Sequence, residues 1–196
     1  MTDVAQSASD QHPAASDETR FLSQRRTVHD FEPTPVDSGV VLAALESAIW
    51  APNHHRSEPW RFYWLNGAAQ EKVIALNTGL VEAAKGERAA QVKQRRWASV
   101  PGWMVLTCQR GEDALRERED YAACCCAAQN FMLHLWANGI GSKWTTGKVT
   151  RLPEFYATIG ADPDRESVVG MFWYGHPAAV NSQRRRPLSE VLTYCE

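Results

Sequence analysis

The sequence predicts a protein of the α+β class. Helical patterns and short apolar runs typical of strands follow one another irregularly, without the regular alternation that produces a doubly wound parallel sheet. The chain has 196 residues, 44% of them hydrophobic and 22% charged, which is typical of a single globular domain. We expect that domain over residues 19–196. Residues 1–18 have almost no large apolar side chains, and we expect them to form a flexible tail.

The first helix is predicted before Pro52, and a strand after it. Apolar residues recur at helical spacing from Val36 to Ile49, and Pro52 stops the pattern. Residues 61–65 (RFYWL) are aromatic and short, and Asn66-Gly67 follows them as a turn signal. The chain therefore passes from a helix with one buried face, through the segment APNHHRSEPW, into a strand.

The rest of the chain predicts two more strands and two more helical regions. Residues 68–97 are helical in composition but polar, residues 100–108 (VPGWMVLTC) indicate a buried strand, and residues 167–174 (SVVGMFWY) indicate another. Between these strands, residues 121–137 form a helix that is apolar on nearly every side and ends at Gly139. Such a helix belongs at the centre of a core or in a subunit interface.

Charge and hydropathy exclude some classes of function. A formal net charge of −2 gives no general attraction to nucleic acid or anionic membranes. No apolar run approaches the roughly 20 residues of a membrane-spanning helix, and no signal peptide is recognisable, so we expect a cytoplasmic protein. Lys93, Arg95 and Arg96 could contact nucleic acid, but a solvated helix face explains them better.

The consecutive cysteines Cys124, Cys125 and Cys126 do not have the spacing of a zinc or redox site. On a helix, neighbouring side chains point in different directions. We interpret the three thiols as small core residues in a reducing compartment.

Two basic clusters are candidates for binding a phosphate. Arg25, Arg26 and Thr27 precede the first long helix, and Arg184, Arg185 and Arg186 precede Pro187. Arginine offers a planar fork of donors and threonine a hydroxyl, so the clusters would form a phosphate pocket if they met in space. Taken separately, each cluster is explained better by solvated surface charge.

Residues 139–147 (GIGSKWTTG) are expected to form a loop that a flat ligand could approach. Three glycines and three hydroxyl residues would let backbone amides and hydroxyls point at ligand heteroatoms. The segment closes a helix, so it is not the dinucleotide-binding fingerprint, which follows a strand and opens a helix. Taken alone, such a segment is more often a simple helix cap and turn than a ligand site.

Metal and hydrolase chemistry find little support in the sequence. His54 and His55 are adjacent, so on regular backbone their side chains should diverge, and no HExxH or cysteine pair stands near them. We therefore predict no metal site. The sequence also lacks the GxSxG nucleophile turn of a serine hydrolase.

In this order, the motifs resemble those of the FMN-dependent nitroreductase family, most closely its small NAD(P)H nitroreductase branch. The matching elements are Arg25-Arg26-Thr27 with Phe31, the segment APNHHRSEPWRF, the segment GIGSKWTTG, and the closing GHP with RRRPLSEVL. The resemblance implies an α+β sandwich with a central, mostly antiparallel sheet flanked by helices. It also implies an intertwined homodimer with an FMN site at each subunit interface.

The resemblance carries over specific residues to the FMN site. Arg25, Arg26, Thr27 and Arg185 would hold the flavin phosphate and ribityl chain, Trp50 and His54 would contact the flavin, and Trp144, Thr145 and Thr146 would lie against its ring. The nicotinamide nucleotide would bind along the end of the central helix, at His134, Leu135, Trp136, Ala137, Asn138 and Gly139.

Some positions depart from the family pattern. Thr27 replaces the usual serine and keeps the hydroxyl. His29 stands where a second basic residue is common, so we expect one phosphate contact to be either weaker or dependent on pH. His55 and Arg56 are not fixed by the motif.

The function implied by the resemblance is reduction of nitroaromatics, quinones or similar planar acceptors by NADH or NADPH. The flavin N5 would relay the hydride in a ping-pong reaction, so no catalytic side chain is required. A flavin- or nucleotide-binding carrier or sensor without turnover would use the same binding residues.

Overall fold

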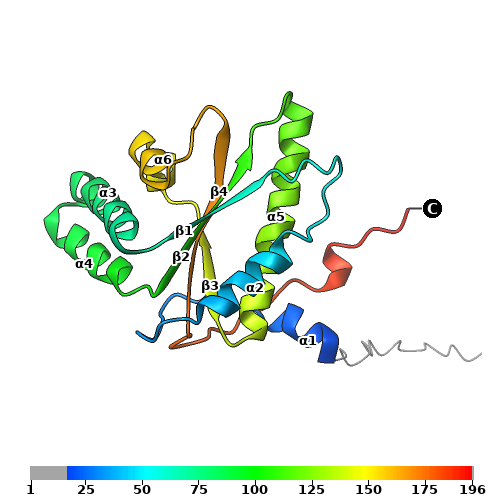
Figure 1. Cartoon of the computed structure of the whole chain (residues 1–196). Helices are drawn as coiled ribbons and strands as arrows, with labels where there is room; N and C mark the ends of the chain where they lie inside the picture. Colours follow the sequence, from blue (N-terminus) through cyan, green and yellow to red (C-terminus); the bar gives the residue numbers. More distant parts are fainter. Residues whose placement is uncertain (1–16, 196) are drawn as a thin grey trace, which may run out of the picture.

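A computed structural model describes residues 17–195 as a four-stranded antiparallel sheet with helices on both faces (Figure 1). The strands are β1 (Trp60–Leu65), β2 (Gly102–Gln109), β3 (Gly141–Thr145) and β4 (Glu166–Gly175). Their order in the sheet is β1-β2-β4-β3, with β2 and β4 in the centre. The predicted α+β class and antiparallel sheet are confirmed.

One face of the sheet is covered by α2 (Ser38–Ala48) and α5 (Ala114–Ala137) (Figure 1). Asp37 caps α2 by accepting hydrogen bonds from the backbone N–H groups of Gly39 and Val40, which satisfies donors that the helix itself cannot pair. Val41 and Ala44 of α2 and Phe131 of α5 are buried against this face of the sheet.

The other face is covered by α3 (Gly67–Lys85), α4 (Glu87–Ala98) and α6 (Pro153–Ile159). The predicted helical region is confirmed there, but it divides at Gly86, whose φ of 81° ends α3. Trp97 of α4 packs edge-on against Trp103 of β2 and Trp173 of β4, with ring centroids 5.4 and 5.1 Å away. Three indole rings therefore form the centre of this second core.

Several boundaries differ from the sequence prediction. The central helix begins at Ala114, earlier than predicted, because Asp113 caps it through the Arg116 amide. Residues 1–16 of the predicted tail lie outside the described part of the chain, and its last two residues, Asp17 and Glu18, begin α1 (Asp17–Gln24). Short 3₁₀ helices occur at Lys148–Arg151 (η1) and Leu188–Glu190 (η2).

The cysteine interpretation agrees with the packing. Cys108 and Cys124 are fully buried in the first core, and Cys125 and Cys126 are half-buried against it. All described cysteines are free thiols. Among residues 17–195, no helix combines the length and the apolar character needed to cross a bilayer.

Candidate functional site

The segment around Thr27 lies against β3 and continues the edge of the sheet. The Val28 amide donates a 3.0 Å hydrogen bond to the Ser142 carbonyl, and Thr27 pairs with Ser142 as an isolated parallel bridge. Gly141 makes this approach possible, since a Cβ there would lie 2.5 Å from Val28 Cγ2. The arginines preceding Thr27 are thereby held at the end of the sheet.

The chain after β4 runs beside residues 30–32, which follow Thr27. The Glu32 amide donates to the His176 carbonyl at 2.9 Å, and the Ala178 amide donates to the Asp30 carbonyl at 3.0 Å. Phe31 and Pro177 pair as an isolated antiparallel bridge. The segment before α2 is therefore enclosed between β3 and the segment that leads to the second arginine cluster.

One arginine of the second basic cluster, Arg185, lies near enough to Arg25 of the first for their charges to interact. Burial lowers the pKa of the Arg25 guanidinium, and the positive charges of Arg185 and Arg26 lower it further. No ion pair among the described residues involves any of these three arginines. Like charges gathered without a carboxylate partner are the arrangement that an anionic ligand stabilises.

One buried polar atom beside this cluster has no protein partner. Ser142 is 1% exposed, and its hydroxyl oxygen makes no hydrogen bond within the described residues. An unpaired buried hydroxyl costs free energy unless a ligand or solvent completes it. Ser142 is one of the three hydroxyl residues of the predicted ligand loop, but only the bridge with Thr27 reveals that it lies beside the phosphate candidates.

Residues 139–147 are not a loop throughout, so that prediction is wrong. Gly141–Thr145 forms β3, which pairs with β4 from Gly141 opposite Gly175 to Thr145 opposite Met171. Only Thr146 and Gly147 remain as the connection to η1. The predicted helix end is confirmed, since α5 stops at Ala137 and Gly139 has a φ of 75°.

The Trp144 side chain packs against the sheet. Its indole Nε1 donates a 3.1 Å hydrogen bond to the Val169 carbonyl, and its ring lies 5.2 Å from Phe172. Thr145 is half-buried and Thr146 is exposed. The groups that this end of β3 offers to a ligand are therefore backbone amides and threonine hydroxyls, with Trp144 fixing the strand from behind.

Trp50 and His54 lie on the surface in the segment after α2. Trp50 follows α2 and is 84% exposed, and His54 is exposed in the next turn. No contact among the described residues joins either of them to Arg25 or Arg185. A tryptophan so fully exposed is unusual for a residue with that much apolar surface.

The predicted nicotinamide stretch contributes only partly to the surface. His134 and Ala137 line a shallow groove of about 580 Å³ that also includes Trp50 and Phe21. The His134 ring Nδ1 lies 2.8 Å from the Ser47 hydroxyl, which fixes the ring on α2. Leu135 is fully buried and cannot contact a ligand. Trp136 is half-buried, and Asn138 and Gly139 are exposed at the turn.

His29 belongs to a second group of basic residues. Partial burial lowers its pKa, and the charges of Lys143 and Arg96 lower it further, against the opposing effect of Asp30. Lys143 itself lies 4.9 Å from the Trp173 ring centroid, and its pKa is lowered mainly by burial. The sequence did not identify Lys143 as a neighbour of His29, because β3 brings it there.

The expectation that His54 and His55 diverge is wrong. Their ring centroids are 4.2 Å apart, with an angle of 57° between the rings. Residues 53–58 are not regular backbone, since Arg56 and Glu58 both have positive φ values, 54° and 46°. The geometric argument against a shared ligand therefore does not apply to this turn.

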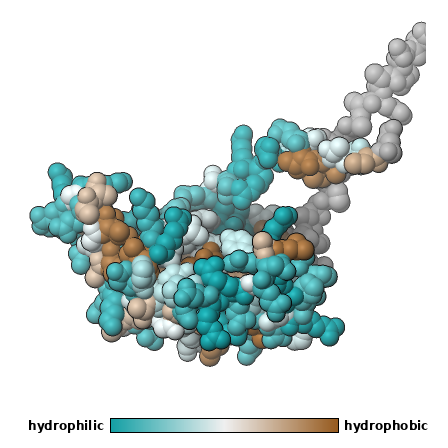
Figure 2. All heavy atoms as spheres, turned by 90° about the horizontal axis from the view of Figure 1, so that it is seen from above, coloured by the Kyte–Doolittle hydropathy of each residue, from teal (hydrophilic) through white to brown (hydrophobic). Residues whose placement is uncertain are grey.

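Hydrophobic side chains are exposed on the surface of the protein, notably in the segment after β4. Figure 2 shows hydrophobic atoms on a largely hydrophilic face and on an arm that stands away from the body. The segment after β4 carries several exposed apolar residues, namely Val180, Leu188, Val191, Leu192 and Tyr194. Exposed apolar surface on this scale is typical of a protein contact.

Comparison with known proteins agrees with the fold and the order of motifs. The model of the Nitroreductase family matches residues 22–176. The chain is 31% identical over 179 residues to the Bacillus subtilis protein named "Putative NAD(P)H nitroreductase YfhC", covering 88% of this chain and 91% of that protein. It is 25% identical to Escherichia coli "Putative NAD(P)H nitroreductase YdjA", with 82% and 88% covered.

Solved structures show the same fold. A nitroreductase-like family protein from Bacillus cereus superposes with a TM-score of 0.81 at 27% identity, covering 94% of this chain and 99% of that one. A Desulfovibrio desulfuricans protein described as a "putative nitroreductase in complex with fmn" superposes with a TM-score of 0.75 at 22% identity, covering 93% and 99%. With a family model matched over most of its length and a closely similar curated relative, the chain belongs to the nitroreductase family.

Proposed function

We propose that this chain is an NAD(P)H-dependent FMN oxidoreductase that reduces nitroaromatics, quinones or similar planar acceptors. The observation that carries the proposal is that Arg25 lies near Arg26 and Arg185, and that none of the three forms an ion pair among the described residues. Family membership and the FMN reported for the Desulfovibrio protein support it. The cytoplasmic location expected from the sequence is part of the same proposal.

The flavin phosphate would occupy the space between the arginines. Guanidinium groups bind phosphate oxygens through charge-assisted hydrogen bonds, which relieve the mutual repulsion of Arg25 and Arg185. Thr27 is exposed next to Arg26, and it pairs in the bridge with Ser142, whose buried hydroxyl has no hydrogen-bond partner among the described residues. These residues therefore fit the group in both charge and hydrogen-bonding capacity.

The end of β3 would hold the flavin ring. When bound, FMN would supply hydride transfer from a nicotinamide to the second substrate, so the protein would need to supply only binding and orientation. Backbone amides and the hydroxyls of Thr145 and Thr146 would hydrogen-bond to the ring edge and favour negative charge there. Trp144 would act through the strand, since its indole already donates to Val169.

A second copy of the chain would complete the site. Trp50 and His54 are exposed and make no described contact with the arginines, so they would reach the flavin of the partner subunit in the homodimer. The exposed apolar residues after β4 and those beside Trp50, including Phe21 and Leu22, would be covered by the same association. Burial of that surface would drive dimer formation.

The nicotinamide nucleotide would approach along the groove at the end of α5. His134 and Ala137 line this groove together with Trp50, which the proposal places at a flavin. A reductant bound there would lie near the ring that receives its hydride.

Anaerobic reduction separates the enzyme from a carrier or sensor without turnover. The purified protein should show a flavin absorption band that bleaches when NADH or NADPH is added without oxygen, and the band should return when a quinone or nitroaromatic is added. A band that stays oxidised with both nucleotides would favour the carrier, and protein that takes up no flavin would exclude both the enzyme and a flavin-binding carrier.

Arginine substitution tests the phosphate assignment. Arg25→Ala and Arg185→Ala should yield folded protein with little bound FMN. Arg88→Ala, which removes the same charge from an exposed position on α4, is the matched control and should retain flavin. Normal flavin content in both site variants would refute the assignment.

A further inference from the structure

We propose that His54, His55 and Glu119 form a binding site for a divalent transition-metal ion such as Zn²⁺. The inference does not depend on the proposed flavin chemistry. One nitrogen from each imidazole and one carboxylate oxygen all lie within 4.8 Å of one another. The ligands come from two separate parts of the chain, the turn at residues 53–58 and the first half of α5.

The separation of the ligand atoms fits metal coordination. His55 Nε2 lies 3.3 Å from Glu119 Oε2. Ligands bound to zinc at about 2.0–2.2 Å in a tetrahedral arrangement lie roughly 3.3–3.6 Å apart. His55 and Glu119 thus already have the spacing of two zinc ligands. His54 is exposed, so its side chain is free to rotate into the third position.

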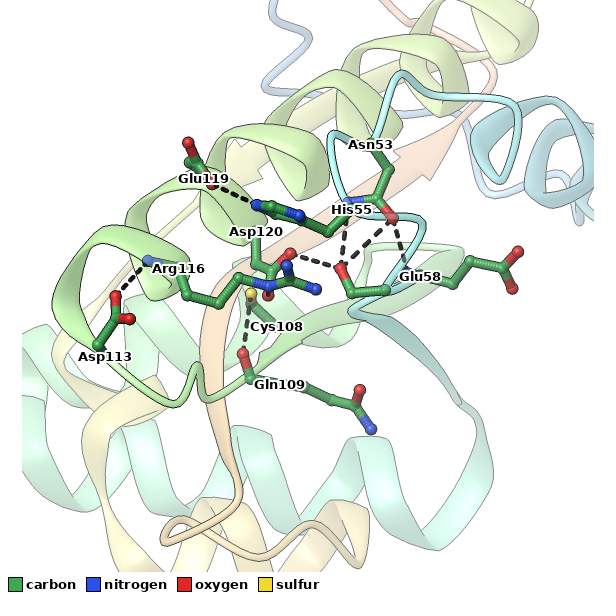
Figure 3. A network of polar contacts seen from close by, with 10 residues as sticks. Asn53, His55, Glu58, Cys108, Gln109, Asp113, Arg116, Glu119 and Asp120 are labelled. Atoms are coloured by element: carbon green, nitrogen blue, oxygen red, sulfur yellow. Dashed lines mark hydrogen bonds and ion pairs between the residues drawn. The ribbon is translucent and has the colours of Figure 1, made fainter.

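The turn that carries the histidines is held against α5 by a polar network (Figure 3). The Asn53 side-chain oxygen accepts a 2.8 Å hydrogen bond from the Glu58 amide, and the Asn53 amide nitrogen donates to the Ser57 hydroxyl at 3.1 Å. The Ser57 hydroxyl donates in turn to Asp120 Oδ1 at 2.5 Å. The turn is therefore closed on itself and anchored to the residue next to Glu119.

Asp120 is a buried anchor with its own charge compensated. It is 4% exposed, and its second oxygen accepts a 3.0 Å hydrogen bond from Arg116 Nε one helical turn earlier. Asp120 is thus engaged with Ser57 and Arg116, whereas Glu119 is directed toward His55 (Figure 3). Supporting contacts of this kind set the orientation of metal ligands and strengthen binding.

The surface leaves room for an ion and its remaining ligands. His54 and Glu119 line a shallow hollow of about 460 Å³, together with Ala122, Ala123 and Cys126 of α5. His55 and Glu119 line an adjoining hollow of about 430 Å³. Glu119 stands between the two, and the alanines below it leave space for water or a further ligand to complete the coordination.

The ligand types select the class of metal. Two imidazoles and one carboxylate suit Zn²⁺, Co²⁺, Ni²⁺ or Cu²⁺, whereas Mg²⁺ and Ca²⁺ prefer oxygen ligands alone. Three protein ligands leave at least one open position, as in catalytic rather than structural zinc sites. Each imidazole binds a metal through a single nitrogen, so His54 keeps its other nitrogen for the flavin contact proposed above.

Direct metal titration tests the site. Tag-free protein treated with EDTA and dialysed should bind one Zn²⁺ per chain in competition with a chromophoric chelator, and Co²⁺ should give visible absorption bands of an imidazole site. His55→Ala and Glu119→Gln should each weaken Zn²⁺ binding by at least the 10- to 100-fold seen when only a supporting residue is lost.

Two matched controls guard against general surface binding. Glu112→Gln removes a carboxylate that lines only the adjoining hollow, and His176→Ala removes an imidazole outside the group; both should bind Zn²⁺ like the wild type. Equal Zn²⁺ affinity in the wild type and both ligand variants would overturn the proposal, as would no measurable binding by the wild type. Thermal melting confirms folding, and neither ligand variant alters a buried residue.

This test is separate from that of the flavin function, since it needs neither flavin nor nicotinamide. A protein that binds Zn²⁺ but is not reduced by NAD(P)H would support the proposed metal site and refute the proposed oxidoreductase activity. A protein that is reduced by NAD(P)H but does not bind Zn²⁺ would support the oxidoreductase activity and refute the metal site.

Discussion

Arg25 and Arg185 lie close enough for the charge of one to lower the pKa of the other, although the whole sheet separates them in the chain. The repulsion between them is a cost that the folded protein bears in the absence of an anion. Removal of one of the charges is therefore expected to weaken the binding of FMN and to stabilise the flavin-free protein.

Arg185→Gln should preserve or slightly raise the melting temperature of the flavin-free protein, because it removes the repulsion. The same variant should bind FMN about tenfold to a hundredfold more weakly, as expected for one lost charge-assisted interaction. Differential scanning fluorimetry with and without FMN measures both effects. A variant that melts well below the flavin-free wild type would contradict this account of the pair.

Gly170→Ala should destabilise the protein by about 1–3 kcal/mol, the usual cost of overpacking a core. A Cβ at Gly170 would overlap the indole ring of Trp144, which is hydrogen-bonded to the neighbouring carbonyl. The matched control is Gly79→Ala in α3, where a Cβ meets nothing, and it should stabilise by about 0.5–1 kcal/mol. Urea denaturation gives both values, and equal effects would refute the packing at Trp144.

Stability should fall between about pH 10 and pH 12 through Tyr63. Burial and the hydrogen bond to Glu166 raise the pKa of Tyr63 to about 12, above its ordinary value of 10.0. The folded state therefore holds the phenol proton where the unfolded state loses it, so this contribution is complete below pH 10 and disappears as the pH rises. Tyr63→Phe should show a smaller loss of denaturation midpoint between pH 9 and pH 11 than the wild type. An equal loss in both would contradict the assignment.

The thiols should react in the order of their exposure. Cys195 is exposed, whereas Cys124 is buried. The pKa of Cys124 is raised by its hydrogen bond with Cys108, which has the larger effect, and by burial. Since the thiolate is the reactive form, iodoacetamide at pH 8 should modify Cys195 in the native protein and Cys124 only in denaturant. Peptide mass spectrometry gives the order; native modification of Cys124 at the rate of Cys195 would show that the core is not packed as described.

The sequence predicts those elements whose pattern is long and strong. The helix ending before Pro52, the buried strand at residues 100–108 and the apolar helix before Gly139 all match the structure within a few residues, apart from the capped start at Asp113. Strand β3 could not be predicted in the same way, because GSKWT is short and contains glycine and lysine. Its structure comes from pairing with β4 and from the bridge to Thr27, which are non-local.

The candidate sites follow the same division. The basic character of Arg25 and Arg185 is visible in the sequence, but their meeting depends on the chain passing between β3 and the segment after β4. The approach of His54 to His55 depends on left-handed backbone at Arg56, which residue type does not favour. The sequence therefore shows which chemical groups are present, whereas the tertiary structure determines which of them become neighbours.

The position of the arginines relative to the sheet has a mechanical consequence. Arg25 precedes every described strand and Arg185 follows them all, so an anion bound between them joins the two ends of the folded unit. Such a ligand acts as a reversible cross-link that closes one long loop around the sheet, comparable in principle to a disulfide across the same positions. Fraying of either flanking segment would then require release of the ligand. The stability of the whole fold would therefore depend on how fully this one site is occupied.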